Sequence, residues 1–487
     1  MYRTRLLAGL LVASGLAAAC SSAPAPVSLT QDPAGGPLAT ASPGQPATPA
    51  PGSTAGPSGQ PGPRGTAGGP AAPGRGTTTT GPAPGGSHGG AGPVAPVGPV
   101  AQLFTPAEDR IGITPTSITM CAHAALTYGA AFNTTADDFN VFWTAVNTEK
   151  GGVFGRKVTV TYENDNYDPN TAVEAATACK AKNIFMLLGG IGFDQIPNVR
   201  NWAERNHVLY LHHTATVKGS KGLKYSFTEL PTVERMGEGF AQLYLSKYRG
   251  KKVGIVERDS TNWKPGADAF RDALARAGLS VVKDNKVADK KHNYTQDILD
   301  MKNAGAEVVF LWENALNSTE FIVQAKRQAY SPQYLMFPFN LTSQTLADDA
   351  MSPPLDGVAM FPAYSNGDYS GSFASYADDV RLFEQQYAKY RPNADLAGFG
   401  GDLLFLNWTA QKALYAQLLL CGKDCTRNKF VTLLQSYKGR PTSSACLIDF
   451  TTGDGHHGAE RLNFMQTYAA PGGKVNWRNT RACVGRP

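Results

Sequence analysis

The sequence predicts an α/β protein built from two doubly wound lobes, each around a parallel sheet. Nine short apolar runs follow one another between residues 118 and 361, and segments with helical periodicity separate them. Strands that alternate with helices form parallel sheets covered on both faces. The part of the chain available for folding, roughly 380 residues, is longer than one hydrophobic core usually supports, so we expect two sheets.

The predicted strands are short and rich in β-branched and aromatic residues. They are Ile118–Cys121, Val158–Tyr162, Ile184–Leu188, Val208–His212, Val253–Val256, Val281–Val287, Val308–Trp312, Tyr334–Phe337 and Val358–Phe361. Between the strands, apolar residues recur at three- and four-residue steps, as at Phe139, Phe142 and Val146. Phe240 and Leu243 repeat this spacing, which predicts helices.

Residues 1–20 are a predicted export signal. Arg3 and Arg5 precede an apolar stretch of about 14 residues, which is too short to span a membrane. The sequence Leu-Ala-Ala-Ala-Cys that ends at Cys20 resembles the bacterial lipobox, in which the cysteine takes a diacylglycerol and becomes the mature N-terminus. An ordinary signal peptide that contains a cysteine is the alternative. We expect a protein that is lipid-anchored at the extracellular face of the cytoplasmic membrane.

Residues 21–105 form a predicted disordered tether. Pro, Gly, Ala, Ser and Thr dominate this segment, so it contains too little apolar surface to offset the entropy of ordering. A flexible chain of about 80 residues has a reach on the order of 50 Å. That reach is sufficient to hold a folded domain away from a membrane.

The distribution of charged and apolar residues argues against nucleic-acid binding and against a further membrane span. The formal net charge of +6 is spread along the sequence, and its basic clusters are only pairs such as Lys251-Lys252, so we expect no nucleic-acid binding. No later segment approaches 18 consecutive apolar residues. The lipid on Cys20 is therefore the only expected contact with the membrane.

The cysteines predict disulfide bonds, since an exported protein meets no reducing pool. Apart from Cys20, the chain has an even set of six, and fifteen pairings are possible. The pairs that we expect are Cys121 with Cys179, Cys421 with Cys425, and Cys446 with Cys483. Half of a zinc site at Cys421 and Cys425 is the alternative, but no second Cys or His pair follows at the required spacing.

One stretch has a specific order of loop residues. A helix that includes Asn147 is expected to end at the glycines of Gly-Gly-x-x-Gly (residues 151–155), which accept positive φ, and a strand follows. After that strand, Asp168 is a predicted helix cap and Pro169 a first-turn residue. On spacing alone, this is ordinary loop chemistry.

The same order of a helix ending after Asn147, a Gly-Gly-x-x-Gly turn, a strand and Asp-Pro-x-x-Ala resembles the branched-chain amino-acid-binding proteins of ABC importers. The resemblance extends from about Ile111 to Gln466. It implies the type I periplasmic binding protein fold, with two α/β lobes joined by a three-segment hinge. Residues 106–230 and about 364–445 would form the first lobe, and 231–363 and about 446–487 the second.

The resemblance also implies a solute-binding cleft, and the fold places ligands beyond the carboxyl ends of parallel strands, where helix N-termini favour carboxylates. The candidate residues are Tyr128, Gly190, Ile191, Gly192, Thr214, Ala215 and Thr216 in first-lobe loops, and Trp263, Glu313, Asn314, Phe339 and Asn340 in second-lobe loops. Tyr128 and Trp263 are hypothesised to cover an apolar ligand body from opposite sides. Ordinary surface packing is the alternative for both rings.

The sequence departs from the family at the ammonium site. Amino-acid binders of this family usually carry an acidic residue where this chain has Phe339 or Asn340. A buried ammonium without a counter-charge is costly, so either Glu313 pairs with it or the ligand is not an α-amino acid. Amino acids, amides and small carboxylates all remain open as ligands.

We therefore expect a non-enzymatic, monomeric protein that captures a small polar or amino-acid-like solute and delivers it to the membrane subunits of an ABC importer. No cofactor and no metal are expected. A ligand-sensing or surface interaction module on the same fold, without a transport role, is the first alternative.

A metal-dependent hydrolase is the second alternative. Its best support is two histidine pairs, His212-His213 and His456-His457, together with Asp454. Adjacent histidines in a strand point to opposite faces, however, and the chain contains no His-Glu-x-x-His, Gly-x-Ser-x-Gly or phosphate-loop motif.

Overall fold

The computed structural model describes the folded part of the chain, with gaps. The described residues are 101–127, 134–189, 193–213, 216–288, 291–338, 354–359, 374–396, 399–440, 442, 446–451, 456–469 and 475–486. The predicted signal peptide, Cys20 and the tether up to residue 100 lie outside them.

The first sheet has five strands in the order β2-β1-β3-β4-β5, and every neighbouring pair is parallel. Its strands are β1 (Ser117–Ala124), β2 (Lys157–Asn164), β3 (Leu187–Gly189), β4 (Tyr210–His212) and β5 (Ser226–Thr228). Parallel pairing places the carboxyl ends of all five strands at one edge of the sheet.

The second sheet has seven strands in the order β14-β13-β10-β9-β8-β6-β7. They are β6 (Val253–Arg258), β7 (Lys283–Val287), β8 (Val308–Trp312), β9 (Gln333–Met336), β10 (Asp356–Ala359), β13 (Leu462–Ala469) and β14 (Val475–Val484). The strands from β6 to β10 pair in parallel, whereas β13 pairs antiparallel with both β10 and β14. A short antiparallel pair, β11 (Lys438–Gly439) with β12 (Ile448–Asp449), stands apart from both sheets.

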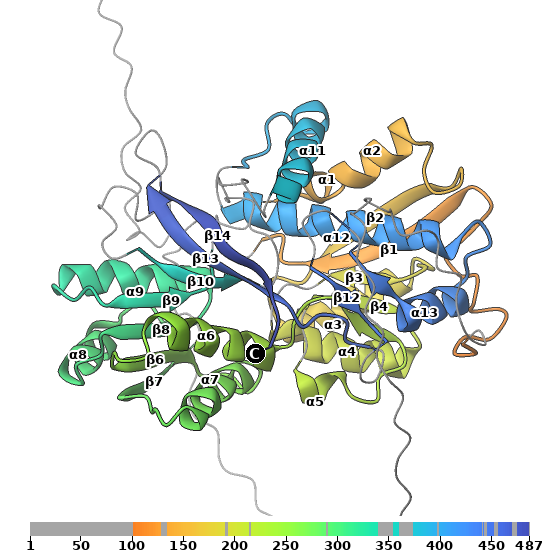
Figure 1. Ribbon diagram of the computed structural model, residues 1–487. Coiled ribbons are helices and arrows are strands. Elements are labelled where there is room, and N and C mark those ends of the chain that lie inside the picture. Colours follow the sequence, from red (N-terminus) through yellow and green to blue (C-terminus); the bar gives the residue numbers. More distant parts are fainter. Residues whose placement is uncertain are drawn as a thin grey trace, which may run out of the picture. The chain divides into compact units, whose positions relative to one another are not determined.

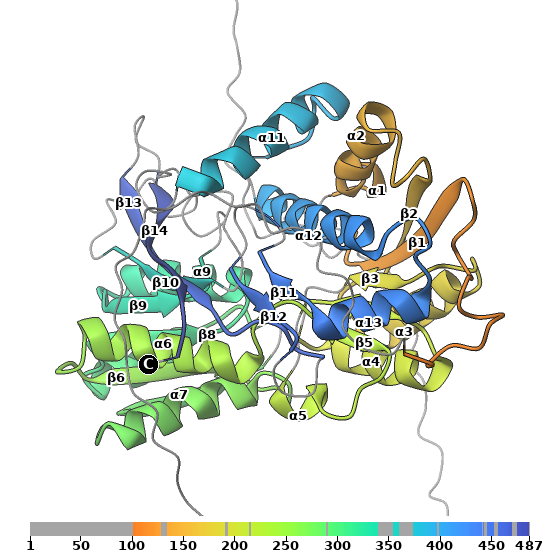
Figure 2. The same ribbon diagram turned by 45° about the vertical axis from the view of Figure 1, so that its right-hand side comes forward.

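Helices cover both faces of each sheet, as Figures 1 and 2 show. The helices are α1 (Ala136–Phe139), α2 (Val141–Glu149), α3 (Pro169–Lys180), α4 (Gln195–Asn206), α5 (Val217–Ser220), α6 (Val233–Lys247), α7 (Lys264–Arg276), α8 (Thr295–Asn303), α9 (Ala315–Arg327), α11 (Ala374–Tyr390), α12 (Phe399–Cys421) and α13 (Arg427–Ser436). Buried residues of α3 and α4 pack on one face of the first sheet, and those of α2, α11, α12 and α13 on the other. On the second sheet, α6 and α7 share one core and α8 and α9 the other.

The predicted fold class is confirmed, because each of the nine predicted strands overlaps a strand of one of two α/β sheets. The chain passes three times between the two sheets and their helices: after β5, after β10 and after β12. The antiparallel pair β13 and β14 and the short strand β5 were not predicted. The second sheet is therefore mixed rather than wholly parallel.

The turn between α2 and β2 shows why its residue types are required. Both amide atoms of Asn147 bond the backbone of Val158: Nδ2 donates to the carbonyl at 2.7 Å, and Oδ1 accepts from the N–H at 2.8 Å. Gly152 has φ +81°, and a Cβ there would lie 2.1 Å from the carbonyl oxygen of Arg156. Only glycine fits this close approach, so the turn delivers the chain from the helix into the strand.

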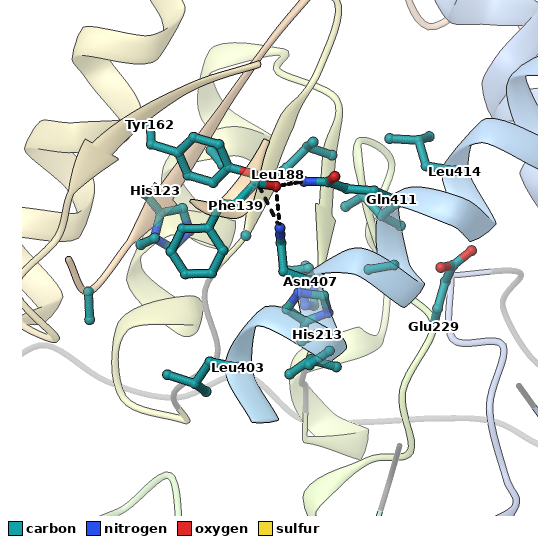
Figure 3. Close-up of a pocket in the computed structure, with 18 residues that line it drawn as sticks. His123, Phe139, Tyr162, Leu188, His213, Glu229, Leu403, Asn407, Gln411 and Leu414 are labelled. Carbon is teal, nitrogen blue, oxygen red and sulfur yellow. Dashed lines mark hydrogen bonds between the residues drawn. The ribbon is translucent and has the colours of Figure 1, made fainter. Parts of the chain in front are cut away.

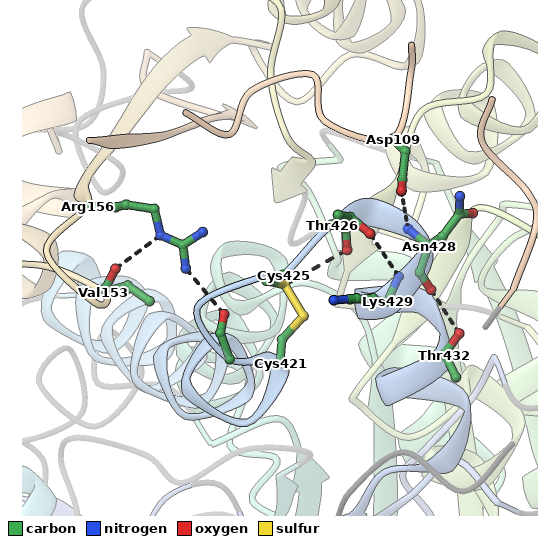
Figure 4. The surroundings of a disulfide bond; sticks show 10 residues. Asp109, Val153, Arg156, Cys421, Cys425, Thr426, Asn428, Lys429 and Thr432 are labelled. Atoms are coloured by element: carbon green, nitrogen blue, oxygen red, sulfur yellow. Dashed lines mark hydrogen bonds between the residues drawn. A yellow bond between two sulfur atoms is a disulfide. The ribbon is translucent and has the colours of Figure 1, made fainter. Parts of the chain in front are cut away.

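Three disulfide bonds join Cys121 to Cys179, Cys421 to Cys425, and Cys446 to Cys483, which is the pairing expected from the sequence. The second bond closes the end of α12, immediately before Thr426 caps α13 by accepting from the N–H of Lys429 (Figure 4). Beside it, Arg156 Nη2 donates to the carbonyl of Gly422 at 3.4 Å. The turn after α2 and the end of α12 are thus joined.

Asp168 caps α3 as predicted, and this contact is a test of the fold. Its Oδ1 accepts from the N–H groups of Asn170 at 2.9 Å and Thr171 at 2.8 Å. Replacing a capping Asp by Ala costs about 1 kcal/mol, whereas Asn caps about as well as Asp. We predict that Asp168→Ala lowers the free energy of urea unfolding by about that amount and that Asp168→Asn changes it little. Equal losses for the two variants would contradict a capping role.

Candidate functional site

A pocket lies at the carboxyl ends of the first sheet, with α12 across one side (Figure 3). It contains about 810 Å³ of space free of protein atoms, including its open mouth. The lining residues are Ala122, His123, Ala124, Ala125, Phe139, Tyr162, Leu188, Gly189, Leu211, His212, His213, Glu229, Leu403, Leu406, Asn407, Ala410, Gln411 and Leu414. The pocket thus occupies the strand edge at which open parallel sheets bind ligands.

Helix α12 contributes one face to the pocket. Its lining residues recur at three- and four-residue steps from Leu403 to Leu414, and most are apolar. This spacing places them on a single stripe of the helix. On the sheet side, Leu188 and Leu211 add to the same apolar wall.

Two polar residues of α12 interrupt this apolar stripe, and both bond across to the sheet side. Asn407 Nδ2 donates to the carbonyl of Phe139 at 3.0 Å, and Gln411 Nε2 donates to the same carbonyl at 2.8 Å. Gln411 Nε2 also donates to the hydroxyl oxygen of Tyr162 at 2.9 Å. The Tyr162 ring stacks on the Phe139 ring with centroids 5.2 Å apart. These bonds fix the orientation of both amides.

Two titratable side chains of the pocket have strongly shifted pKa values. Burial, together with the smaller effect of the neighbouring His123, lowers the pKa of His213 to about 4. Burial raises the pKa of Glu229 to about 7, although a hydrogen bond from Gln417 Nε2 opposes this shift. Both shifts favour the uncharged form of the side chain.

A buried chain of hydrogen bonds supports the pocket from behind. His123 Nδ1 lies 2.8 Å from Asp165 Oδ2, and His123 Nε2 lies 2.7 Å from the hydroxyl oxygen of Tyr210. The Tyr210 hydroxyl donates to the carbonyl of Gly189 at 3.1 Å. Gly189 has φ +107°, and a Cβ there would lie 2.3 Å from the carbonyl oxygen of His123. The end of β3 is therefore held in a conformation that requires glycine.

The structure describes four of the twelve predicted ligand-binding residues. Thr216 caps α5 by accepting from the N–H of Gly219, and Asn314 caps α9 by accepting from the N–H of Asn317. Glu313 is 1% exposed and Trp263 is 4% exposed. The other eight lie outside the described residues: Tyr128, Gly190, Ile191, Gly192, Thr214, Ala215, Phe339 and Asn340. The ligand-binding role of all twelve stays a prediction.

Trp263 packs within an aromatic cluster rather than at a free surface. Its ring centroid lies 4.5 Å from that of Phe193, 5.6 Å from Trp312 and 6.3 Å from Phe337. Its Nε1 donates to Asp194 Oδ2 at 3.2 Å. Phe193, which follows β3, is therefore in ring contact with the indole of Trp263.

Asp194 joins the segment after β3 to the second sheet. It forms an ion pair with Arg258 at 3.2 Å, and its Oδ1 accepts from Ser260 Oγ at 2.8 Å. Asn262 Nδ2 donates to the same oxygen at 3.4 Å. Phe193 belongs to the hydrophobic core of the second sheet although it comes directly after the first. One short segment therefore connects the pocket strand with the other lobe.

The sequence reasoning missed five polar residues that line the pocket: His123, Tyr162, Glu229, Asn407 and Gln411. One signal was available for two of them. Asn407 and Gln411 are four residues apart and stand on the same face of a largely apolar helix. Two amide side chains on a buried helix face need hydrogen-bond partners, and this requirement indicates a polar site opposite that face.

The two histidine pairs lie in different surroundings. His213 lines the pocket, whereas His456 Nδ1 lies 2.9 Å from the carbonyl of Ser226 and its ring stacks on Phe227. Asp454 lies outside the described residues. Among the residues that are described, no three His, Cys, Asp or Glu side chains come close enough together to hold a metal ion. Within the same ranges, no helix is both long enough and apolar enough to cross a bilayer.

The chain is similar in sequence to known proteins. A family model described as periplasmic binding protein matches residues 129–473. Leu/Ile/Val-binding protein homolog 3 of Brucella melitensis is 27% identical over 167 residues, which are 34% of this chain and 45% of the relative. Leu/Ile/Val-binding protein BraC3 of Rhizobium johnstonii is 25% identical over 164 residues, which are 33% and 45% of the two chains. The chain spans about half the length of the curated relatives it matches.

Solved structures share the fold at low identity. A fatty acid ABC transporter substrate-binding protein from Thermomonospora curvata has a TM-score of 0.63 and 16% identity, covering 77% of this chain and 94% of its own. A solute-binding protein from Rhodopseudomonas palustris in complex with 3,4-dihydroxybenzoic acid has a TM-score of 0.62 and 13% identity, covering 77% and 99%. An isoleucine complex of a branched-chain amino acid transporter protein from Streptococcus pneumoniae has a TM-score of 0.58 and 15% identity, covering 75% and 99%.

The shifted pKa values of Glu229 and His213 predict opposite pH dependences of stability. Between about pH 4.5 and 7, folded Glu229 keeps a proton that the unfolded chain has lost, so this residue lowers the free energy of unfolding as pH rises. Between about pH 6.5 and 4, unfolded His213 takes up a proton that the folded form refuses, so this residue lowers the free energy of unfolding as pH falls.

We predict that Glu229→Gln removes the loss of unfolding free energy as pH rises from about 4.5 to 7, and that His213→Asn removes the loss as pH falls from about 6.5 to 4. Urea unfolding measured from pH 4 to pH 8 should therefore change slope in opposite directions for the two variants. Glu174→Gln, at an exposed position of α3, is the control and should leave the slope unchanged. Parallel profiles for all three variants would contradict the burial of these two groups.

Proposed function

Because the chain belongs to the family of periplasmic binding proteins, we propose that it captures a small solute outside the cytoplasm and delivers it to the membrane subunits of an ABC importer. The observation that carries this proposal is the pocket at the carboxyl ends of the first sheet, roofed by α12. No chemical change of the solute is part of the proposal. The protein binds, encloses and releases it.

The proposed solute is an amino acid, an amide or a small carboxylate. The relatives described above are named as Leu/Ile/Val-binding proteins. The structural neighbours include a substrate-binding protein of a fatty acid transporter, a complex with 3,4-dihydroxybenzoic acid and a complex with isoleucine. The mostly apolar lining of the pocket supports a ligand with an apolar body. A charged end of the ligand belongs at the loops after the strands, where main-chain N–H groups stabilise a carboxylate.

The proposed binding surface combines the pocket with the loops predicted from the sequence. Residues 128, 190–192 and 214–216 follow β1, β3 and β4, whose ends line the pocket. Glycines in the second of these loops allow close approach of a ligand to the backbone, and Thr214 and Thr216 supply hydroxyl groups. In this proposal, closure of the two lobes completes the site.

Closure follows from the difference in solute affinity between the open and closed states. A ligand shifts such an equilibrium only by the extent to which it binds one state better. The contacts of Asp194 with Arg258 and Ser260 support a closed arrangement, because they join the segment after β3 to the second sheet. We propose that the importer recognises this closed form.

We further propose that Cys20 carries the lipid and that residues 21–105 tether the folded part to the extracellular face of the cytoplasmic membrane. The support is the lipobox-like sequence that ends at Cys20 and the Pro, Gly, Ala, Ser and Thr content of the following segment. The alternatives of a sensing module and of a hydrolase have no observation in their favour beyond those given for the sequence.

The solute-binding function predicts stabilisation by a ligand. At a concentration one hundred times its dissociation constant, a solute should stabilise the folded protein by about 2.7 kcal/mol. We propose a thermal-shift screen of the purified protein with amino acids, amides and small carboxylates. Ala410→Trp fills the pocket and should abolish the shift, whereas Leu419→Trp, at an exposed position of the same helix, should preserve it. No shift with any compound would count against a receptor.

The lipid anchor predicts the location of the protein. Cys20→Ser removes the thiol that accepts the lipid. Because the acyl chains buried in the bilayer are the proposed attachment of the protein, this variant should move from the membrane fraction into the soluble or secreted fraction. Ser21→Ala is the matched control and should remain with the membrane. Retention of the Cys20→Ser variant in the membrane pellet would refute the anchor and leave the solute-binding proposal untouched.

A further inference from the structure

The hydroxyl group of Tyr162 has a proton to donate within the pocket. Its oxygen accepts from Gln411 Nε2 at 2.9 Å and from Asn407 Nδ2 at 3.5 Å, and both of these nitrogens are donors. The hydroxyl proton must therefore point away from the two amides. No acceptor for it stands within hydrogen-bond distance in the described part of the chain.

Gln411 has the complementary capacity. Its Nε2 is fixed by the carbonyl of Phe139 and by Tyr162, which turns Oε1 the other way. This oxygen is buried and lacks a hydrogen-bond partner within the described part of the chain, and the side chain is 3% exposed. A buried amide oxygen without a donor costs free energy, so a donor from the solute would stabilise it.

The two groups are adjacent, because Tyr162 and Gln411 are bonded to each other. Figure 3 shows both side chains on the same side of the pocket, with Glu229 apart from them. The wall therefore presents one O–H donor next to one carbonyl acceptor. A solute group that satisfies both must itself accept and donate. An ammonium only donates and a carboxylate only accepts, so neither fits.

The surroundings also exclude a charge at this point. Phe139, Leu403 and Leu406 are buried neighbours in the lining, and among the described residues no Lys, Arg or Asp side chain lines the pocket; the one acid there, Glu229, lies apart from Tyr162 and Gln411 (Figure 3). Burial lowers the pKa of His213 to about 4, so that side chain is neutral at pH 7. A formal charge placed against this wall would lose its hydration without gaining a counter-charge.

We propose that the solute of this protein carries a hydroxyl or primary carboxamide group at the far end of an apolar body, and that Tyr162 and Gln411 together recognise this group. The inference rests on the proposed solute-binding function and narrows its ligand class. Tyr162 donates to the oxygen of the group, and Gln411 Oε1 accepts from its O–H or N–H. A branched-chain amino acid offers only methyl groups there and leaves both protein atoms unsatisfied.

The test compares probes that differ only at the far end. One set is benzoate, 4-hydroxybenzoate and 4-carbamoylbenzoate, and the other is hexanoate and 6-hydroxyhexanoate. Isothermal titration of the purified full chain should give at least about tenfold tighter binding, or ~1.4 kcal/mol, for the hydroxyl or amide derivative of one set. Leucine should bind more weakly than that derivative.

Variants assign the preference to the two side chains. Tyr162→Phe keeps the stack on Phe139, and Gln411→Met keeps the length of the side chain, so each should abolish the difference in affinity between the derivative and the parent acid. An unchanged far-UV circular dichroism spectrum reports that each variant is folded. Thr409→Val removes a hydroxyl group that bonds the Leu406 carbonyl in the same helix, outside the pocket lining, and should leave the preference intact.

The outcomes separate this inference from the proposed function. Equal affinity for parent and derivative, or leucine as the tightest ligand, overturns the inference and leaves the receptor function standing. A preference that survives both Tyr162→Phe and Gln411→Met overturns the assignment to these residues. Failure of every probe to bind overturns both proposals.

Discussion

The packing of α12 against the first sheet is the contact on which the binding site depends. The strands of that sheet come from residues 117–228, yet α12 spans Phe399–Cys421, after the chain has built most of the second sheet. Buried residues of both regions form one hydrophobic core. Without this return of the chain, the carboxyl ends of the strands would be open to water, and the pocket would lose its apolar wall. Folding of the first lobe and formation of the site are therefore the same event.

Asn407 and Gln411 show how an apolar helix tolerates polar groups and gains a function from them. A buried amide costs free energy unless it is hydrogen-bonded, and the nitrogens of both side chains meet this requirement through the Phe139 carbonyl and the Tyr162 hydroxyl. The amide oxygen of Gln411 takes no part in these bonds and has no partner among the described residues. The structural requirement of the helix thus leaves hydrogen-bonding capacity facing the pocket.

The strands of both sheets were predictable because local sequence determines them. Val308–Trp312 is a continuous apolar run, as a strand covered on both faces must be, and it is β8 without a change of boundary. The hairpin β13 and β14 was missed because polar residues such as Gln466 and Asn476 interrupt it, and its antiparallel pairing with β10 depends on a strand far away in sequence. The disulfide between Cys121 and Cys179 agrees with the expected pairing, although 58 positions separate the two residues and the spacing alone left other pairings open.

The pocket residues were not predictable in the same way, because they are distant in sequence. Tyr162 and Gln411 are 249 positions apart, and no local pattern relates a strand tyrosine to a glutamine on a helix of the returning chain. Loop chemistry suggested the strand ends correctly as a location, since Gly189 and His213 both line the pocket. It gave no sign that Phe193, from the segment after β3, packs against Trp263, and the ligand-binding role of Trp263 stays a prediction.

The segment after β3 links ligand binding to the arrangement of the lobes. Gly189 is held by Tyr210 at the pocket, and four residues later Phe193 enters the core of the second sheet, followed by Asp194 with its ion pair to Arg258. A ligand that contacts the loop between these anchors acts on the same backbone that carries the interlobe contact. Under the proposed function, a solute that favours the arrangement in which Asp194 pairs with Arg258 would favour closure of the lobes by the same free energy. The aromatic cluster around Trp263 lies at this junction, because Phe193 follows β3 in the chain yet packs against Trp263 in the core of the second sheet.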